Sequence, residues 1–261
     1  MNETGMTTVD TPNWTERSAI VTGAASGIGA AVAAKLAARG VAVTAATLRA
    51  GEGGEGVVKQ IIADGGRAQL AFGDVSDESA VAGIFSAATE SFGPPDIVVH
   101  AAGGLTSIAA TAQLEPAEWD RMVAINLRSA FLVIHAALPG MIERGWGRVV
   151  TVASEAGRMP TRVGSSAYAA AKSGVIGLTK HVAREIAAHG VTVNATAPST
   201  TLSPRIQALY PDGGAAVGAQ HPMGRLAEPD EQAAAILFLC SPEASYVNGA
   251  CLDVTGGSVN I

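Results

Sequence analysis

Short apolar runs alternate with longer alanine-rich stretches along most of the chain. In the first of the longer stretches, Ile28, Val32 and Leu36 recur every four positions, which is the spacing of one face of an α-helix. The short runs on either side, residues 19–22 and 41–46, are apolar nearly throughout and do not alternate with polar residues. Such runs are typical of parallel strands that are buried on both faces of a sheet.

The same order of elements continues to the end of the chain. Strands are expected at residues 19–22, 41–46, 68–72, 97–99, 149–152, 191–195 and 252–254, and helices near 28–39, 77–92, 116–144, 166–189 and 230–240. Residues 51–56 are expected to form a flexible glycine-rich turn. The repeated strand–helix–strand order predicts an α/β fold, a doubly wound parallel sheet with helices on both faces. Because no repeat or linker interrupts it, residues 17–261 are expected to form one domain after a flexible leader, residues 1–16.

Composition and charge narrow the classes of function. The chain of 261 residues is 48% hydrophobic, which excludes a disordered protein. With 17 Lys and Arg against 23 Asp and Glu, the net charge is −6, which disfavours nucleic acid as a partner. The polar N-terminus lacks the features of a signal peptide, and no apolar run approaches the roughly 18–20 residues of a membrane span. Two cysteines cannot build a disulfide framework, so we expect a cytoplasmic protein that binds no membrane.

Three glycines lie where the first predicted strand meets its helix. Gly23, Gly27 and Gly29 permit a tight turn and a close approach of the backbone to a pyrophosphate. The helix that follows offers free N–H groups and the positive end of its dipole to the anion. This position after a strand favours a dinucleotide site over a purely structural turn.

A second candidate site lies on the predicted helix 166–189. Tyr168 and Lys172 are four residues apart, which places them on one face of the helix. A phenol ordinarily ionises at about pH 10. A neighbouring ammonium group favours the phenolate, so we expect Lys172 to lower the pKa of Tyr168. Ser154 follows a predicted strand, and ligands of parallel sheets bind at the carboxyl ends of strands. From the residues alone, a solvated helix pair and an ordinary loop serine remain alternatives.

These motifs together resemble the classical short-chain dehydrogenase/reductase family, and the resemblance extends from about residue 17 to residue 257. Segments 74–75, 194–198, 222–225 and 253–257 also resemble family motifs. The resemblance implies a Rossmann fold and a catalytic set of Asn126, Ser154, Tyr168 and Lys172, without a metal. It implies cofactor contacts at Gly23, Ser26, Gly27, Ile28, Gly29, Thr47, Arg49, Asp74, Val75, Ala102, Gly103, Tyr168, Lys172, Pro198, Ser199, Thr201 and Ser203.

The resemblance also assigns roles to the catalytic set. Tyr168 transfers a proton to and from the substrate oxygen, and Ser154 hydrogen-bonds that oxygen. Lys172 lowers the pKa of Tyr168 and binds the nicotinamide ribose. Asn126 holds a water that links the lysine to solvent.

The chain departs from the family pattern at three positions. His100 stands where the family usually has an asparagine, and we expect it to replace that residue's hydrogen bonds, with a role in the chemistry as the alternative. Ser199 replaces a glycine after Pro198. Ser203 replaces a threonine that contacts the cofactor and keeps its hydroxyl group.

The end of the second strand bears on cofactor choice. Family members that prefer NAD usually carry an acid there, for the ribose 2′-hydroxyl, whereas this chain has Thr47. Arg49 can pair with a 2′-phosphate, which favours NADP(H) over NAD(H). Ser26 and Leu48 occupy positions where relatives that prefer the phosphate usually carry a basic residue, so NAD(H) remains an alternative.

The family reading implies an NAD(P)-dependent oxidoreductase that interconverts a secondary alcohol and a ketone. One alternative is a 3-oxoacyl-thioester reductase, which the absence of basic docking residues at Gly145 and His189 weakens. A second alternative is a non-catalytic dinucleotide-binding regulator, which the presence of the complete catalytic set weakens.

Three further expectations concern the substrate and the assembly. Residues 200–220 are expected to form an irregular, mobile lid, because they contain Pro204 and a pair of glycines. Arg158 and Arg162 either meet an anionic substrate or are ordinary solvated arginines. The helices near 116–144 and 166–189 correspond to those that pair in family tetramers, so a homotetramer or homodimer is expected.

Overall fold

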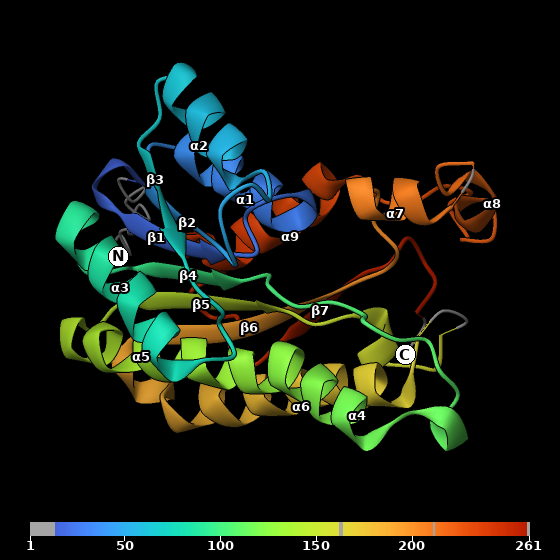
Figure 1. Cartoon of the computed structure of the whole chain (residues 1–261). Coiled ribbons are helices and arrows are strands. Elements are labelled where there is room, and N and C mark those ends of the chain that lie inside the picture. Colours follow the sequence, from blue (N-terminus) through green and yellow to red (C-terminus); the bar gives the residue numbers. More distant parts are fainter. Residues whose placement is uncertain (1–13, 162–163, 211, 260–261) are drawn as a thin grey trace, which may run out of the picture.

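The computed structural model describes residues 14–161, 164–210 and 212–259, and its centre is one parallel sheet (Figure 1). The seven strands lie in the order β3-β2-β1-β4-β5-β6-β7, and every pair is parallel. The strands are β1 Ser18–Thr22, β2 Ala42–Thr47, β3 Ala68–Phe72, β4 Ile97–His100, β5 Gly147–Val152, β6 Val191–Pro198 and β7 Cys251–Val254. The order reverses direction between β1 and β4, and the carboxyl end of that pair is the expected ligand crevice.

Two layers of helices cover the sheet (Figure 1). The helices are α1 Gly27–Ala37, α2 Gly54–Ala63, α3 Glu78–Phe92, α4 Pro116–Val123, α5 Ser129–Arg144, α6 Ser166–Glu185, α7 Pro204–Leu209, α8 Ala215–Gly218 and α9 Pro229–Cys240. The layer of α1, α2 and α9 lies on one face, and the layer of α3, α5 and α6 lies on the other. Each face of the sheet has its own hydrophobic core: the first core lies under α1 and α9, and the second core lies under α3 and α5. Within β1, Val21 packs into the first core and Ile20 into the second, which is why the strand is apolar at successive positions.

Helix α2 is the main element that the sequence pattern missed, because it begins inside the predicted glycine turn. Gly53 caps it with a φ of 109°, and Gly54 is its first residue. A Cβ on Gly54 would lie 2.7 Å from Thr47 Cγ2, so close packing against β2 requires glycine there. A glycine-rich start therefore reflects contact with the sheet and not a flexible turn.

The predicted helix 116–144 is divided by a π turn. Helix α4 ends at Val123, residues Ala124–Arg128 form the π turn, and α5 continues from Ser129. By length and composition the combined stretch Pro116–Arg144 is apolar enough to cross a membrane, unlike the expectation from the sequence, but 44% of its most apolar window is buried inside the protein. Helix α5 packs on the sheet, and a core helix of this kind passes the same test.

Two segments differ in detail from their predicted form. Trp14–Glu16, assigned above to the leader, form a 3-10 turn, and Trp14 packs against the core. The predicted irregular lid contains α7 and α8. Pro204 stands at the first position of α7, where its missing N–H costs no hydrogen bond, and Ser203 caps the helix.

Candidate active site

The glycine turn between β1 and α1 is packed against the loop that follows β4. A Cβ on Gly23 would lie 2.8 Å from Ala102 N, and one on Gly29 would lie 2.2 Å from Gly23 O. Both positions therefore require glycine, and Gly23 also has a φ of 68°. The predicted positions Gly23, Gly29 and Ala102 thus come together at the carboxyl ends of β1 and β4.

The start of α1 fits an anion. Ser26 is the N-cap residue, yet among the described residues its side chain caps none of the first backbone N–H groups. Uncapped N–H groups at a helix start form a ready phosphate site. Gly27 has a φ of 55°, which favours glycine. A Cβ on Gly27 would lie 3.7 Å from Ser203 Cβ, so Ser203, the residue just before α7, lies over the glycine turn. Ile28 packs part of its side chain against the core.

The residues predicted to contact the adenosine end lie after β2 and β3. Thr47 is buried, and its Oγ1 has no hydrogen-bond partner within the described part of the chain. Arg49 is exposed and pairs with Glu52 at 3.1 Å. Asp74 Oδ1 accepts hydrogen bonds from the backbone N–H and hydroxyl of Ser76. Val75 packs partly against the second core.

Asn126 fastens the loop after β4 to the π turn. Its Nδ2 donates to Gly104 O and Met122 O at 2.9 and 3.0 Å, and its Oδ1 accepts from Gly104 N at 2.9 Å. A Cβ on Gly103 would lie 2.6 Å from Asn126 Oδ1, so the loop lies directly on the amide. Both amide N–H groups of Asn126 are therefore used by backbone carbonyls. The water that Asn126 is predicted to hold stays a prediction. The π turn around Asn126 is consistent with a functional role, because such turns often mark functional sites.

Ser154, Tyr168 and Lys172 come together at the end of β5. Ser165 caps α6 by accepting from Tyr168 N, which places Tyr168 in the first turn of that helix. The hydroxyl group of Ser154 lies close enough to Tyr168 to lower the pKa of its phenol. Lys172 is 5% exposed, donates from Nζ to Val152 O at 2.7 Å, and lies 5.8 Å from the centre of the Tyr168 ring.

The expected lowering of the Tyr168 pKa by Lys172 is wrong for this structure. Burial raises the pKa of Tyr168, and this effect exceeds the lowering by the Ser154 hydroxyl group and by the charge of Arg205. Lys172 directs its ammonium group at Val152 O. Burial also lowers the pKa of Lys172 to about 8, because the buried ammonium is poorly solvated.

Two charged residues that the sequence reasoning missed act on Tyr168. Glu155 follows Ser154 directly, and its carboxylate raises the pKa of Tyr168. Burial raises the pKa of Glu155 itself, and this effect exceeds the lowering by the backbone of Thr200. Arg205 of α7 donates to Leu105 O, next to the loop that Asn126 holds. The position of Glu155 next to the candidate catalytic serine could have indicated it as a site residue. No sequence pattern indicated Arg205.

Replacing Glu155 with glutamine should shift the titration of Tyr168 to lower pH. At the pH values where Tyr168 ionises, Glu155 is already a carboxylate, and its negative charge opposes formation of the phenolate. Removing that charge lowers the pKa of Tyr168, so the pH–rate profile of the alcohol oxidation that the family resemblance implies should rise at lower pH than in the wild type. Glu185→Gln, at the exposed end of α6, is the matched control. An unchanged or higher midpoint for Glu155→Gln would contradict this assignment.

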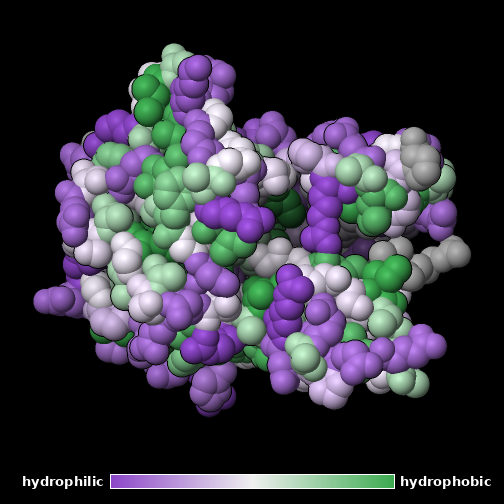
Figure 2. Space-filling view, viewed as in Figure 1, coloured by the Kyte–Doolittle hydropathy of each residue, from purple (hydrophilic) through white to green (hydrophobic). Residues whose placement is uncertain are grey.

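The remaining predicted cofactor residues form the base of the lid. Pro198 ends β6, and Ser199 N donates to Val254 O of β7. Thr201 forms a bridge with Ala227, and its hydroxyl donates to Ser199 O. Figure 2 shows that the surface is hollowed between the lobe of α7 and α8 and the layer that carries α4. The lid base thus spans the crevice from the sheet to the glycine turn.

Arg158 does not face the crevice as a free cation. Its Nε and Nη2 donate to the two carboxylate oxygens of Asp253 at 2.9 and 2.7 Å. This bidentate pair commits Arg158 to β7, which overturns its suggested role in meeting an anionic substrate. Arg162 lies outside the described residues. No group of three or more His, Cys, Asp or Glu side chains among the described residues is placed to hold a metal ion.

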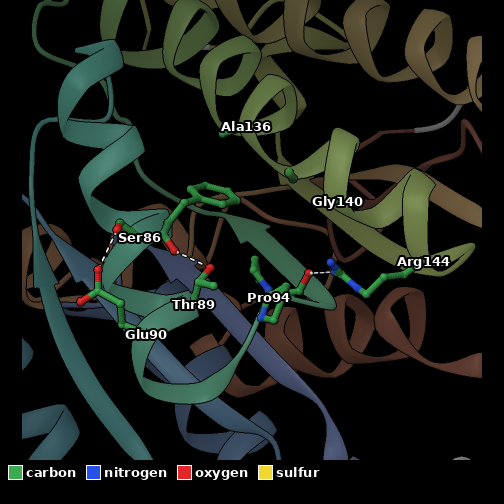
Figure 3. Close-up of a pocket in the computed structure, with 10 residues that line it drawn as sticks. Ser86, Thr89, Glu90, Pro94, Ala136, Gly140 and Arg144 are labelled. Carbon is green, nitrogen blue, oxygen red and sulfur yellow. Dashed lines mark hydrogen bonds between the residues drawn. The ribbon is translucent and has the colours of Figure 1, made fainter.

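A separate cavity of 330 Å³ lies between α3 and α5 (Figure 3). Its lining includes Phe85 and Glu90 of α3 and Gly140 and Arg144 of α5. Arg144 donates to Pro95 O, just before β4 begins. This cavity therefore lies at the amino end of the strands, away from the candidate active site.

The comparisons with known proteins agree on one family. A family model described as enoyl-(acyl carrier protein) reductase matches residues 23–259. Cis-4-hydroxycyclohexanecarboxylate dehydrogenase of Sinomonas cyclohexanicum is 43% identical over 93% of this chain and 96% of its own length. The 3-oxoacyl-acyl-carrier-protein reductase of Vibrio cholerae is 39% identical over 92% of this chain and 96% of its own.

Solved structures share the fold and span nearly the whole chain. Levodione reductase superposes with a TM-score of 0.87 at 35% identity, covering 93% of this chain and 97% of its own. Actinorhodin polyketide ketoreductase with NADPH gives 0.88 at 33% identity, over 94% and 98%. A Brucella melitensis 3-oxoacyl-acyl-carrier-protein reductase with bound NAD gives 0.83 at 35% identity, over 93% and 90%. The chain therefore belongs to the classical short-chain dehydrogenase/reductase family, and it is an NAD(P)-dependent oxidoreductase.

Proposed function

We propose that the protein interconverts a secondary alcohol and a ketone and prefers NADP(H) over NAD(H). The observation that carries the proposal is the convergence of three side chains at the carboxyl end of β5. Lys172 lies 5.8 Å from the centre of the Tyr168 ring, one turn along α6, and Ser154, just after β5, acts on the pKa of the Tyr168 phenol. A proton donor, a second hydroxyl and a buried cation are the groups that carbonyl reduction requires beside a hydride source.

The residues of the crevice suit the cofactor. The glycine contacts at Gly23 and Gly29 leave space that a Cβ would fill, and the uncapped start of α1 offers N–H groups to a pyrophosphate. The unpartnered Thr47 hydroxyl at the end of β2 provides a polar contact for the adenosine end. When bound, the nicotinamide ring supplies or accepts the hydride.

The chain's own groups then handle the proton and the substrate oxygen. Tyr168 donates its phenolic proton to the oxygen in ketone reduction and takes it back in alcohol oxidation. Ser154 Oγ accepts a hydrogen bond from Ala156 N at 3.2 Å, which orients the hydroxyl group, and it donates its own proton to the substrate oxygen. Lys172, with its pKa lowered to about 8, can release and regain a proton near neutral pH beneath the tyrosine. Asn126 keeps the loop at Gly104 in place.

Arg49 is proposed to recognise the 2′-phosphate of NADP(H). Arg49 now pairs with Glu52, but an exposed pair of this kind contributes little, so a phosphate can replace the carboxylate. Arg49→Gln should lower kcat/KM for NADPH by roughly 10–100-fold, the worth of a hydrogen bond to a charged group, and leave NADH nearly unaffected. Arg184→Gln, on the exposed side of α6, is the control. A wild type that strongly prefers NADH, or an equal loss with both cofactors, would refute this role.

The substrate is proposed to be a small secondary alcohol or its ketone. The first relative named above acts on a cyclic alcohol that bears a carboxylate. The positive charge of Arg205, which reaches Tyr168, supports an anionic group on the substrate. A 3-oxoacyl-thioester is the second candidate, because the Vibrio cholerae relative reduces that class. The absence of basic residues at Gly145 and His189 speaks against it.

A panel of substrates tests the proposal. It contains cis-4-hydroxycyclohexanecarboxylate, its methyl ester, the corresponding ketones, simple cyclic and linear ketones and an acetoacetyl thioester, each with NADP(H) and NAD(H). Nicotinamide absorbance should report turnover of an alcohol and its ketone, faster for the free acid than for the ester. Turnover of the thioester alone would favour the second candidate. Cofactor binding without turnover of any member would instead indicate a non-catalytic regulator.

A further inference from the structure

His100 lies at the end of β4, where β1, the loop after β4 and the π turn meet. Its side chain is 2% exposed, and its neighbours Thr22 of β1 and Ser129 of α5 are 1% and 0% exposed. His100 Nδ1 lies 2.9 Å from Thr22 Oγ1, and Nε2 lies 3.1 Å from Ser129 Oγ. Both ring nitrogens are therefore engaged in a closed, polar network.

The direction of each hydrogen bond follows from the outer partners. Ser129 Oγ donates to Ile125 O at 2.8 Å, so it accepts from His100 Nε2–H. Thr22 Oγ1 accepts from Ala102 N at 3.2 Å and lies 2.9 Å from His100 Nδ1, to which it can donate its own proton. A neutral imidazole protonated on Nε2 satisfies both ends. Burial and the nearby charge of Lys172 favour this neutral form and lower the pKa of His100 to about 3.

The Ser129 end of the network supports the π turn. Ser129 N donates to Ala124 O, five residues back, so Ile125 O loses the partner that an α-helix would give it. The Ser129 hydroxyl replaces that partner. Asn126 projects from the same turn and holds both polar groups of the Gly104 backbone. The π turn is thus bonded to His100 on one side and to the loop after β4 on the other.

The Thr22 end supports the cofactor side of the same loop. Ala102 N, which Thr22 holds, is the atom that a Cβ on Gly23 would meet at 2.8 Å. Thr22 therefore fixes the spacing between the glycine turn and the loop. One imidazole connects this contact to the π turn.

We propose that His100 is a positioning residue that joins the cofactor loop at Ala102 to the π turn of Asn126 through Thr22 and Ser129. It touches neither the substrate nor the reacting atoms. The inference rests on the proposed function only where turnover is measured, because the two ends of the network can be followed without a substrate.

Two conservative variants separate the two ends. In His100→Asn, the shorter side chain keeps an acceptor in place of Nδ1 for Thr22 but no donor that reaches Ser129. In His100→Gln, the longer side chain keeps a donor in place of Nε2 for Ser129 and loses the acceptor near Thr22. His100→Ala loses both, and Ser129→Ala removes the partner at the π turn alone. His181→Ala, exposed on α6, is the matched control.

Two readouts follow the two ends. The Kd of NADPH, measured by nicotinamide fluorescence, should rise about tenfold in His100→Gln and His100→Ala, the worth of one buried hydrogen bond, and stay near the wild-type value in His100→Asn. Amide hydrogen exchange of residues 122–130 should be faster in His100→Asn, His100→Ala and Ser129→Ala, and should match the wild type in His100→Gln. If a substrate is found, kcat should follow the exchange pattern and KM for NADPH should follow Kd.

A merely structural role for His100 would make the asparagine and glutamine variants alike in both readouts, and that result would overturn the proposal. Unchanged binding and exchange in His100→Ala would overturn it as well. If the alanine variant fails to fold, the opposite patterns of the other two variants still decide. Failure of the wild type to turn over any substrate would count against the proposed function alone, because the exchange pattern needs no reaction.

Discussion

Tyr168→Phe is expected to lower kcat by about 10²–10⁴-fold, the usual contribution of a positioned proton donor. The ring remains, so packing in the first turn of α6 and the contact with Lys172 are kept, while the phenolic proton that is transferred to the substrate oxygen is lost. The Kd of NADPH should stay nearly unchanged. Steady-state kinetics in both directions, with fluorescence titration of the cofactor, measure the two effects separately.

Tyr246→Phe provides the matched control for this variant. Tyr246 is fully exposed, so removing its hydroxyl should leave kcat and cofactor affinity at the wild-type values. A kcat for Tyr168→Phe close to that of the wild type would refute the role of Tyr168. Loss of cofactor binding together with activity would mean that the hydroxyl serves the cofactor site and not proton transfer.

Gly29→Ala is expected to disrupt the cofactor turn most strongly. The added Cβ would lie 2.2 Å from Gly23 O and 2.7 Å from Gly23 C, and both are backbone atoms that no side-chain rotation can move aside. The turn must therefore open, which separates the start of α1 from β1. Overpacking of this kind costs about 1–3 kcal/mol, so we expect a lower Tm and an NADPH Kd at least tenfold higher.

Gly56→Ala is the control for the glycine change. Gly56 lies exposed in α2, and a Cβ there meets no atom of the described residues within 4 Å. Because alanine favours a helix by up to about 1 kcal/mol over glycine, this variant should be as stable as the wild type or slightly more stable. Equal behaviour of the two variants in Tm and Kd would contradict the proposed close contact at Gly29.

The sequence predicted those parts of the fold that depend on local spacing. The apolar runs located the seven strands, and the five strands between β3 and β7 are buried throughout, as a continuous apolar run predicts. The glycine turn and the pair Tyr168 and Lys172 were recognisable because their chemistry depends on residues close together in the chain. These features also carried the resemblance that the comparisons confirm.

Other features depend on contacts between distant residues, so the sequence did not predict them. Helix α2 was not predicted because glycine stands at its first position, Gly54. Glycine is required there because a Cβ would collide with the side chain of Thr47 on β2. The π turn within 116–144 has no signature in a hydrophobic pattern, since it inserts only one extra residue into a helical period. The ion pair of Arg158 could not be predicted, because its partner Asp253 lies 95 residues away in the sequence. The sign of the Tyr168 pKa shift depended on burial, which the spacing from Lys172 does not reveal.

Hydride transfer at the Tyr168 site is the central claim, and an isotope experiment tests it most directly. The protein is incubated with NADPH that carries deuterium at both positions of the nicotinamide C4 and with the best ketone of the panel. The alcohol is then analysed by mass spectrometry and NMR. The proposal predicts one deuterium on the carbinol carbon of the wild-type product, and at least about a hundredfold less of this labelled alcohol from Tyr168→Phe in the same time. An alcohol without deuterium at that carbon, or equal labelled product from the variant, would contradict it.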